Sequence, residues 1–315
     1  MLHFDELRRT RDAPACTSAS GTMRVSRHRG VLTRPLAAAC VFFAVALASA
    51  AEPSHTLDRI KADAVIRLGY RSGAAPFSFK ERDGTVRGYS AELCTHVAAA
   101  VQKRLGMPNL RIEWVALDAD NRLDAVASGR VDMECGTTTI SLSRYEKVDF
   151  SLPIFIDGGS VLVSAASKVE RFADLDGKKL AFIPGTTTER ALKRQLEVVG
   201  AHVQPVAVKN SVEGIRMVTQ GKADGYASDR IVLIALRSTA AEPEKLNLLE
   251  SDFSFEPYAL VVRRDDPDFR LAVNRALVEL YRSGDIDPIF HRWLGGLGQP
   301  GPLLNAMFYL STLPE

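Results

Sequence analysis

Residues 121–139 read Asn-Arg-Leu-Asp-Ala-Val-Ala-Ser-Gly-Arg-Val-Asp-Met-Glu-Cys-Gly-Thr-Thr-Thr. Residues 121–127 predict a helix, which ends at Gly129 because glycine readily takes the left-handed conformation that follows a helix. Residues 131–134 follow at once as a strand, and a turn rich in glycine and threonine leaves it at 135–139. A helix that leads directly into a strand is part of a crossover unit, so this stretch predicts a parallel sheet.

The same plan extends in both directions along the chain. Segments 128–132 (Ser-Gly-Arg-Val-Asp) and 220–224 (Gln-Gly-Lys-Ala-Asp) match, and each is a helix stop followed by a strand. We therefore predict an α/β protein with two lobes of the same plan, each a mostly parallel sheet flanked by helices. The other expected strands are 65–70, 110–116, 180–183, 203–208 and 223–227, and the other expected helices are 89–105, 189–199, 212–219, 268–282 and a short one ending at Trp293.

Two passages connect the predicted lobes. Residues 150–163 contain Pro153 and the pair Gly158-Gly159, and 254–262 provide the return. A cleft between two lobes that are joined by two short crossover strands, which form the hinge, is a usual place for a small-molecule site. We expect lobe 1 to be discontinuous, with 55–157 plus 257–295, lobe 2 to comprise 158–256, and 296–315 to be a C-terminal tail.

Residues 1–50 have the features of an export leader. Four arginines between 24 and 34 precede the apolar run 36–47 and Ala48-Ser49-Ala50, which is the pattern of a cleaved secretory signal. The apolar run is shorter than the roughly 20 residues of a membrane-spanning helix. We predict a leader at 1–50 whose natural start is Met23, and a periplasmic location for the mature protein.

Charge and cysteine content restrict the partners. The chain has 40 Lys and Arg and 38 Asp and Glu. The leader accounts for seven of the basic and three of the acidic residues, so 33 basic and 35 acidic residues remain, a formal net charge of −2. This balance predicts no nucleic-acid partner. Cys94 and Cys135 remain after the leader, and in an oxidising compartment they form either a disulfide or two buried thiols. No cluster has metal-ligand spacing, so we expect no metal and no other cofactor.

Polar residues gather where the predicted strands end, which is where ligands bind in α/β sheets. Taken alone, each has an ordinary alternative: a surface position for an arginine, or a helix cap for Thr186 and Asp229. Their joint placement at strand exits favours one binding site. The residues are Arg71, Asn121-Arg122, the turn 135–139 followed by Arg144, Gly185-Thr186-Thr187, and Asp229.

Three arginines with one aspartate suit a ligand that has two carboxylates and one ammonium group. Arginine grips a carboxylate through paired, charge-assisted hydrogen bonds, and an aspartate balances an ammonium. A neutral amino acid would leave guanidinium charge buried without a partner, and a basic ligand would be repelled. The sequence therefore favours glutamate or aspartate.

The chain also resembles family 3 of the extracellular solute-binding proteins, over about 56–311. Gly-Tyr-Ser and Gly-Thr-Thr are common across the family, whereas Arg71, Asn121-Arg122 and Glu134-Cys135-Gly136 are more particular to its branch that binds glutamate and aspartate. The stretches that carry the resemblance are Thr56-Leu57-Asp58-Arg59-Ile60, Pro76-Phe77-Ser78, Gly88-Tyr89-Ser90, Glu134-Cys135-Gly136-Thr137-Thr138-Thr139, Phe172-Ala173-Asp174-Leu175, Gly185-Thr186-Thr187 and Arg264-Asp265-Asp266-Pro267.

The resemblance implies a type II periplasmic-binding-protein fold that closes by hinge motion and delivers an amino acid to the permease of an ABC transporter. It implies that the protein acts as a monomer and is not an enzyme. Carried over by position, Arg144 and Thr139 hold the α-carboxylate, Thr137 and Asp229 the α-ammonium, and Arg71 and Arg122 the side-chain carboxylate, while Thr186 and Thr187 contribute from lobe 2.

Three positions depart from the family pattern. Ser211 stands where similar proteins have a histidine beside the side-chain carboxylate, and Ala119 replaces a serine there. Two donors are therefore lost from the distal pocket, which leaves the preference between glutamate and aspartate open. Leu260 occupies the place of the family's partner for Cys135, so a disulfide here would use Cys94.

Three other functions are compatible with the same fold. A dehydratase-like periplasmic enzyme would need an acid or base in the cleft, but histidines are scarce at the strand exits, and Glu134, inside a strand, suggests a structural role. A ligand-sensing receptor module would be expected to carry an output domain. A binding protein for another amino acid or a dicarboxylate would differ only in its pocket.

Overall fold

Lobe 1 is built on a five-stranded sheet with the order β5-β1-β6-β13-β7. The computed structural model describes residues 56–314, to which all structural statements refer; the predicted leader and its start at Met23 lie outside them. The strands β1, β5 and β6 are parallel, and β13 runs antiparallel to β6 and β7. Their bounds are β1 Val65–Arg71, β5 Arg111–Leu117, β6 Met133–Glu134, β7 Val148–Asp157 and β13 Glu256–Arg263.

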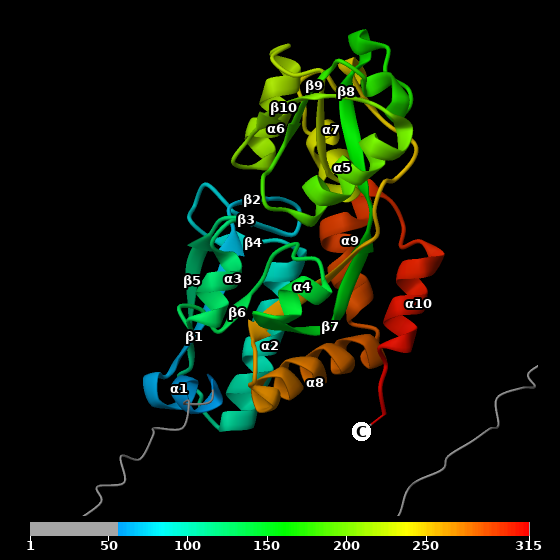
Figure 1. The fold of residues 1–315 in the computed structure, drawn as a ribbon. Helices are drawn as coiled ribbons and strands as arrows, with labels where there is room; N and C mark the ends of the chain where they lie inside the picture. The colour runs from blue at the N-terminus through cyan, green and yellow to red at the C-terminus, as the bar shows by residue number, and fades with distance from the viewer. Residues whose placement is uncertain (1–55, 315) are drawn as a thin grey trace, which may run out of the picture. The chain divides into compact units, whose positions relative to one another are not determined.

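Helices cover this sheet, and a small second sheet lies at its edge (Figure 1). The small sheet has the order β2-β3-β4, with β2 Gly73–Ala74, β3 Ser78–Lys80 and β4 Val86–Arg87. The predicted helix 89–105 is confirmed as α2, which ends at Gly106 in the left-handed conformation. The helices of lobe 1 are α1 Thr56–Asp63, α2 Tyr89–Leu105, α3 Arg122–Ala127, α4 Leu142–Tyr145, α8 Pro267–Ser283, α9 Ile286–Leu294 and α10 Pro302–Leu310, with a 3-10 turn η4 at Gly295–Leu297.

Lobe 2 repeats the plan with the strand order β10-β9-β11-β8-β12. In it β9, β10 and β11 are parallel, and β8 is antiparallel to β11 and β12. Its strands are β8 Gly159–Ser164, β9 Lys179–Phe182, β10 Gln204–Ala207, β11 Gly225–Asp229 and β12 Leu246–Leu248. Its helices are α5 Thr187–Val199, α6 Ser211–Thr219 and α7 Arg230–Ser238, with 3-10 turns η1 Ala165–Ser167, η2 Phe172–Leu175 and η3 Pro243–Lys245.

The short sequence match between the lobes has a structural counterpart. In lobe 1 the backbone N–H of Asp132 donates to the carbonyl of Arg67, and its carboxylate accepts from the N–H of Arg67 at 2.7 Å. In lobe 2 Asp224 makes the same pair of bonds with Lys179, the second at 2.8 Å. Each aspartate therefore ties the third parallel strand of its lobe to the first.

Two crossover strands connect the lobes. β7 ends at Asp157, and after Gly158 the chain continues as β8 in lobe 2. The return strand β13 begins at Glu256, which pairs with Asp157. The two crossings thus lie side by side, which is the arrangement of a hinge.

Each lobe has its own apolar core. In lobe 1 four buried aromatic rings pack edge to face or stacked: Phe77, Tyr89, Phe155 and Tyr258. Lobe 2 has one cluster under α5 and another between α6, α7 and the sheet. The cores are separate clusters, and Ile231 of α7 in lobe 2 is partly buried against the core of lobe 1.

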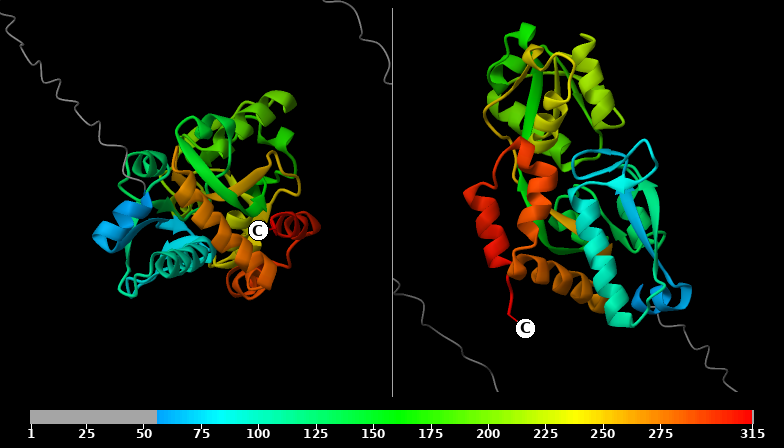
Figure 2. Two further views of the ribbon diagram at one scale, coloured as in Figure 1. Left: turned by 90° about the horizontal axis from the view of Figure 1, so that it is seen from below. Right: turned by 180° about the vertical axis from the view of Figure 1, so that it is seen from behind.

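The segment 296–315, expected to be a tail, contains a helix. α10 packs on β7 (Figure 2) and inserts Leu304, Met307 and Phe308 into the core of lobe 1. The sequence analysis also missed α1, α7, β12 and the small sheet β2-β3-β4. Among residues 56–314, no helix is both long enough and apolar enough to cross a membrane.

Candidate functional site

One cavity is lined by side chains of both lobes. All nine residues that the sequence placed in the binding site line this cavity: Arg71, Arg122, Thr137, Thr139, Arg144, Thr186, Thr187, Ser211 and Asp229. The sequence analysis did not name the remaining lining residues, which are Gly73, Ala74, Ile183, Thr188, Tyr226, Ala227, Ser228 and Val232.

The carboxyl ends of the parallel strands bring the lobe 1 residues together. Arg71 is the last residue of β1, Arg122 begins α3 after β5, and Thr137 and Thr139 follow β6. Arg144 lies on the short helix α4, whose N-cap Ser141 accepts a bond from the Arg144 N–H. Strands that are neighbours in a parallel sheet end at the same edge, so residues far apart in sequence meet there.

Arg122 and Arg144 are buried and held by hydrogen bonds. Arg122 Nε donates to Thr138 Oγ1 at 2.8 Å, and Arg144 Nη1 donates to the carbonyl of Thr139 at 2.6 Å. Burial, together with the nearby guanidinium groups of Arg71 and Arg144, lowers the pKa of Arg122 to about 9. Burial and Arg190 also lower the pKa of Arg144. The charged forms of both arginines are thus destabilised, and an anion bound in the cavity would stabilise them.

Arg71 and the buried Glu134 meet at Gly136. A Cβ at Gly136 would lie 2.2 Å from Glu134 Oε1 and 2.8 Å from Arg71 Cγ, so only glycine fits there. Glu134 is fully buried, and neither of its carboxylate oxygens has a hydrogen-bond partner among the described residues. Its charge acts on Arg122 and Arg144. Glu134 therefore offsets part of the arginine charge from behind the cavity.

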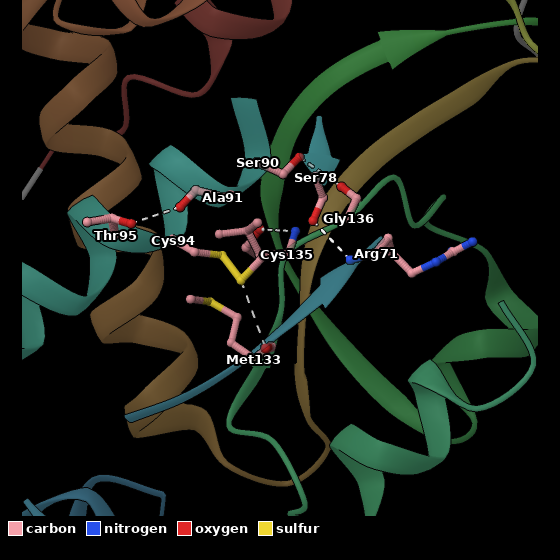
Figure 3. The surroundings of a disulfide bond; sticks show 11 residues. Arg71, Ser78, Ser90, Ala91, Cys94, Thr95, Met133, Cys135 and Gly136 are labelled. Carbon is pink, nitrogen blue, oxygen red and sulfur yellow. Dashed lines mark hydrogen bonds between the residues drawn. A yellow bond between two sulfur atoms is a disulfide. The ribbon is translucent and has the colours of Figure 1, made fainter. Parts of the chain in front are cut away.

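Cys94 and Cys135 are joined by a disulfide, with Sγ–Sγ 2.18 Å and Cα–Cα 6.2 Å (Figure 3). The bond fastens the turn that follows β6 to α2, and Ser90 Oγ of the same helix donates to the carbonyl of Gly136 at 2.8 Å. Figure 3 also shows the side chain of Arg71 extending away from the disulfide. These two ties support the backbone that carries Thr137 and Thr139.

On the lobe 2 side the cavity meets the N-terminus of α5. Thr186 is its N-cap: the hydroxyl accepts from Glu189 N at 3.1 Å and donates to the carbonyl of Ile183 at 2.9 Å. The hydroxyl hydrogen of Thr186 is therefore used within lobe 2. The free N–H groups of a helix N-terminus favour an anion.

Asp229 ends β11 and points toward α5 rather than capping α7. Its Oδ1 accepts from Thr188 Oγ1 at 2.9 Å, and no side-chain cap bond forms at α7. Burial and then the charge of Glu256 raise the pKa of Asp229 to about 6. Burial and Asp229 raise the pKa of Asp157 to about 8, and the Tyr258 hydroxyl donates to Asp157 Oδ2 at 3.1 Å.

Glu256 is a site residue that the sequence analysis missed. It begins β13 and is 1% exposed, and its Oε2 accepts from Thr139 Oγ1 at 2.6 Å and from Thr187 Oγ1 at 2.8 Å. At another part of the cavity, the buried Tyr226 donates its hydroxyl to Ser211 Oγ at 3.2 Å. Glu256 follows neither a helix stop nor a Gly-Thr turn, and Tyr226 lies within the expected strand 223–227 rather than at its end, so neither was marked as a site residue.

Residues 66–296 match the bacterial extracellular solute-binding proteins, family 3. The chain belongs to this family. The two-lobed architecture of this solute-binding protein, with its two crossover strands, is the type II periplasmic-binding fold that the sequence predicted.

Two curated relatives and one solved structure are similar to this solute-binding protein over most of its length. The L-glutamate/L-aspartate-binding protein of Pseudomonas aeruginosa is 33% identical over 263 residues, 82% of this chain and 86% of that protein. The glutamate/aspartate import solute-binding protein of Salmonella typhimurium is 29% identical over 256 residues, 81% of this chain and 84% of that protein. The crystal structure of an ancestral amino acid-binding protein, a precursor of cyclohexadienyl dehydratase, is 27% identical with a TM-score of 0.66, covering 76% of this chain and 99% of that one.

Proposed function

We propose that the protein captures an acidic amino acid, glutamate or aspartate, in the periplasm and delivers it to the permease of an ABC importer. The observation that carries this proposal is the charge of the cavity lining, which contains three arginines and one carboxylate, Asp229. A ligand with two carboxylates and one ammonium complements that lining. The relatives described as glutamate/aspartate-binding support the same ligand class.

Each end of the ligand has a partner of opposite charge. Arg144 and the N-terminus of α5 receive the α-carboxylate beside Thr139, whose hydroxyl hydrogen is donated to Glu256. Asp229, with Thr137, receives the α-ammonium. Arg71 and Arg122 receive the side-chain carboxylate, with Ser211 beside them. The depressed pKa of Arg122 supports this role, because a carboxylate at that place restores the stability of the buried cation.

Capture proceeds by closure of the hinge. The ligand first binds the arginines of lobe 1, and lobe 2 then closes over it and excludes water. Exclusion of water strengthens the charge-assisted hydrogen bonds. We propose that the protein works as a monomer and reaches the periplasm through the signal within residues 1–50, with cleavage after Ala50.

Substitution of Arg144 tests the proposal. Arg144→Ala leaves the α-carboxylate without its paired donor in a dry site, which costs roughly 3 kcal/mol, or more than a hundredfold in affinity. Calorimetric titration with L-glutamate and L-aspartate measures this loss of affinity. The matched control is Arg104→Ala, since Arg104 is an exposed arginine of α2 in the same lobe. Affinity near that of the wild type for Arg144→Ala would refute the assignment.

We further propose that the protein catalyses no reaction on its ligand. The ancestral structure described as a precursor of a dehydratase makes an enzyme the second candidate. No histidine lines the cavity in the part of the chain that the structure describes, and the only lining carboxylate, Asp229, is held by Thr188. Incubation with prephenate or arogenate should give no product. Turnover of either compound would favour the enzyme.

A further inference from the structure

The Glu256 carboxylate lies at the point where the two lobes and the hinge meet. Thr139, 5% exposed, belongs to lobe 1, Thr187 begins α5 in lobe 2, and Glu256 begins the return strand of the hinge. Both threonine hydroxyls donate to the same oxygen, Oε2, at 2.6 and 2.8 Å. The two hydroxyl oxygens are themselves 3.2 Å apart.

These contacts fix the direction of both hydroxyl hydrogens. A hydroxyl has one hydrogen to donate and two lone pairs to accept with. Once the hydrogens point to Glu256, Thr139 and Thr187 can offer only lone pairs to the cavity. Hydrogen bonds to a charged acceptor in a buried place are the strong ones, so this orientation is firmly held.

The contacts also depend on closure. Thr187 moves with lobe 2, whereas Thr139 belongs to lobe 1, so both can reach one oxygen only when the lobes are together. Arg144 and Asp229 lie within the electrostatic reach of Glu256. The carboxylate therefore stands behind the groups proposed to hold the amino-acid end of the ligand.

We infer that Glu256 is a positioning residue that couples lobe closure to ligand binding by joining Thr139 of lobe 1 to Thr187 of lobe 2. It does not line the cavity and acts through the two threonines. The inference rests on the proposed function, since the ligand used to measure it is an acidic amino acid.

A double-mutant cycle with L-glutamate tests the inference. We expect Glu256→Leu, which has no acceptor, and Thr187→Val each to weaken L-glutamate binding about tenfold or more, in line with the loss of a hydrogen bond to a charged group. Because both remove the same contact, the double variant should bind only slightly more weakly than either single variant. Thr187→Ser keeps the hydroxyl and should therefore lose less affinity than Thr187→Val. Calorimetry gives the affinities, and thermal unfolding without ligand shows whether each variant is folded.

Each outcome has a defined meaning. Three results would overturn the role of Glu256. The losses of affinity in the two single variants could multiply in the double variant, or both single variants could bind as the wild type does. Thr187→Ser could also lose as much affinity as Thr187→Val. If Glu256→Leu does not fold, a cycle between Thr139→Val and Thr187→Val replaces it, because their coupling runs through the same oxygen. A wild-type protein that binds neither glutamate nor aspartate would overturn the proposed function and, with it, this inference.

Discussion

At the residue scale, Tyr226 and Ser211 supply a hydroxyl pair to the cavity from lobe 2. The ring of Tyr226 fits because residue 214 is glycine: a Cβ there would lie 2.4 Å from ring atom Cε2. The phenol is fully buried, and Arg71 lies near enough to affect its pKa. The pair thus stands near the arginine proposed to hold the side-chain carboxylate.

Removal of the Tyr226 hydroxyl should weaken binding of acidic ligands. Tyr226→Phe keeps the ring and loses one donor, so we expect L-glutamate affinity to fall about five- to tenfold, equivalent to about 1 kcal/mol. Calorimetry measures the change, and Tyr309→Phe, at an exposed tyrosine, serves as control. An unchanged affinity for both L-glutamate and L-aspartate would show that this hydroxyl does not act on the ligand.

The arginines and Glu256 differ in how far sequence could predict them. Arg71 ends β1, and Arg122 begins the helix that follows β5. The carboxyl ends of neighbouring parallel strands meet at one edge of the sheet, so the convergence of the two arginines in the cavity followed from the sheet plan. Glu256 joins Thr139 and Thr187 across 117 and 69 positions. Such a contact depends on the register of β13 against β7 and on the angle between the lobes, which no local pattern encodes.

At the element scale, the disulfide ties α2 to the turn after β6. The bond closes a loop across a sequence separation of 41, and a cross-link of that length restricts the unfolded chain. The helix and the strand themselves were predictable from the periodicity of 89–105 and from the segment 131–134 that follows the helix stop at Gly129. Cys94 and Cys135 were the expected pair, but the choice between a disulfide and two buried thiols depends on the Cα–Cα distance of 6.2 Å that the packing of α2 on the sheet creates.

Loss of this cross-link should lower stability. We expect the Cys94→Ala/Cys135→Ala double variant to lose about 2–4 kcal/mol of the free energy of unfolding, as measured by urea denaturation. Reduction of the wild-type protein should give a loss of the same sign, whereas the double variant should not respond to a reductant. A double variant as stable as the oxidised wild type would show that α2 is held mainly by its apolar packing.

At the scale of the whole molecule, two carboxyl groups link the hinge to the site. Asp157 ends β7, the first crossing, and Asp229 ends β11, and the charge of Asp229 contributes to the raised pKa of Asp157. The two-lobed plan was predictable because it repeats in the sequence, as Asp132 and Asp224 show. The meeting of Asp157 and Asp229 was not, since they come from different lobes and approach only through the crossing.

These carboxyl groups should make the ligand-free protein less stable as pH rises. The pKa values of Asp157 and Asp229, about 8 and about 6, lie above the ordinary value of 3.8. Between 3.8 and those values the folded state holds protons that the unfolded state has released, so stability falls as pH increases through this window. We expect the melting temperature of ligand-free protein to decrease between about pH 5 and pH 8, and Asp157→Asn, which cannot ionise, to remove much of that slope.

The affinity for L-glutamate should depend on pH in the opposite direction to the stability of the ligand-free protein. The ammonium of glutamate pairs with ionised Asp229, so L-glutamate affinity should increase as pH rises through about 6, with release of a proton on binding below that pH. Calorimetry in two buffers of different ionisation enthalpy detects the proton. An affinity that is constant from pH 5 to pH 8, with no proton released, would mean that Asp229 is already ionised in the ligand-free site and that Arg144 and the hydroxyl of Thr188 outweigh its burial.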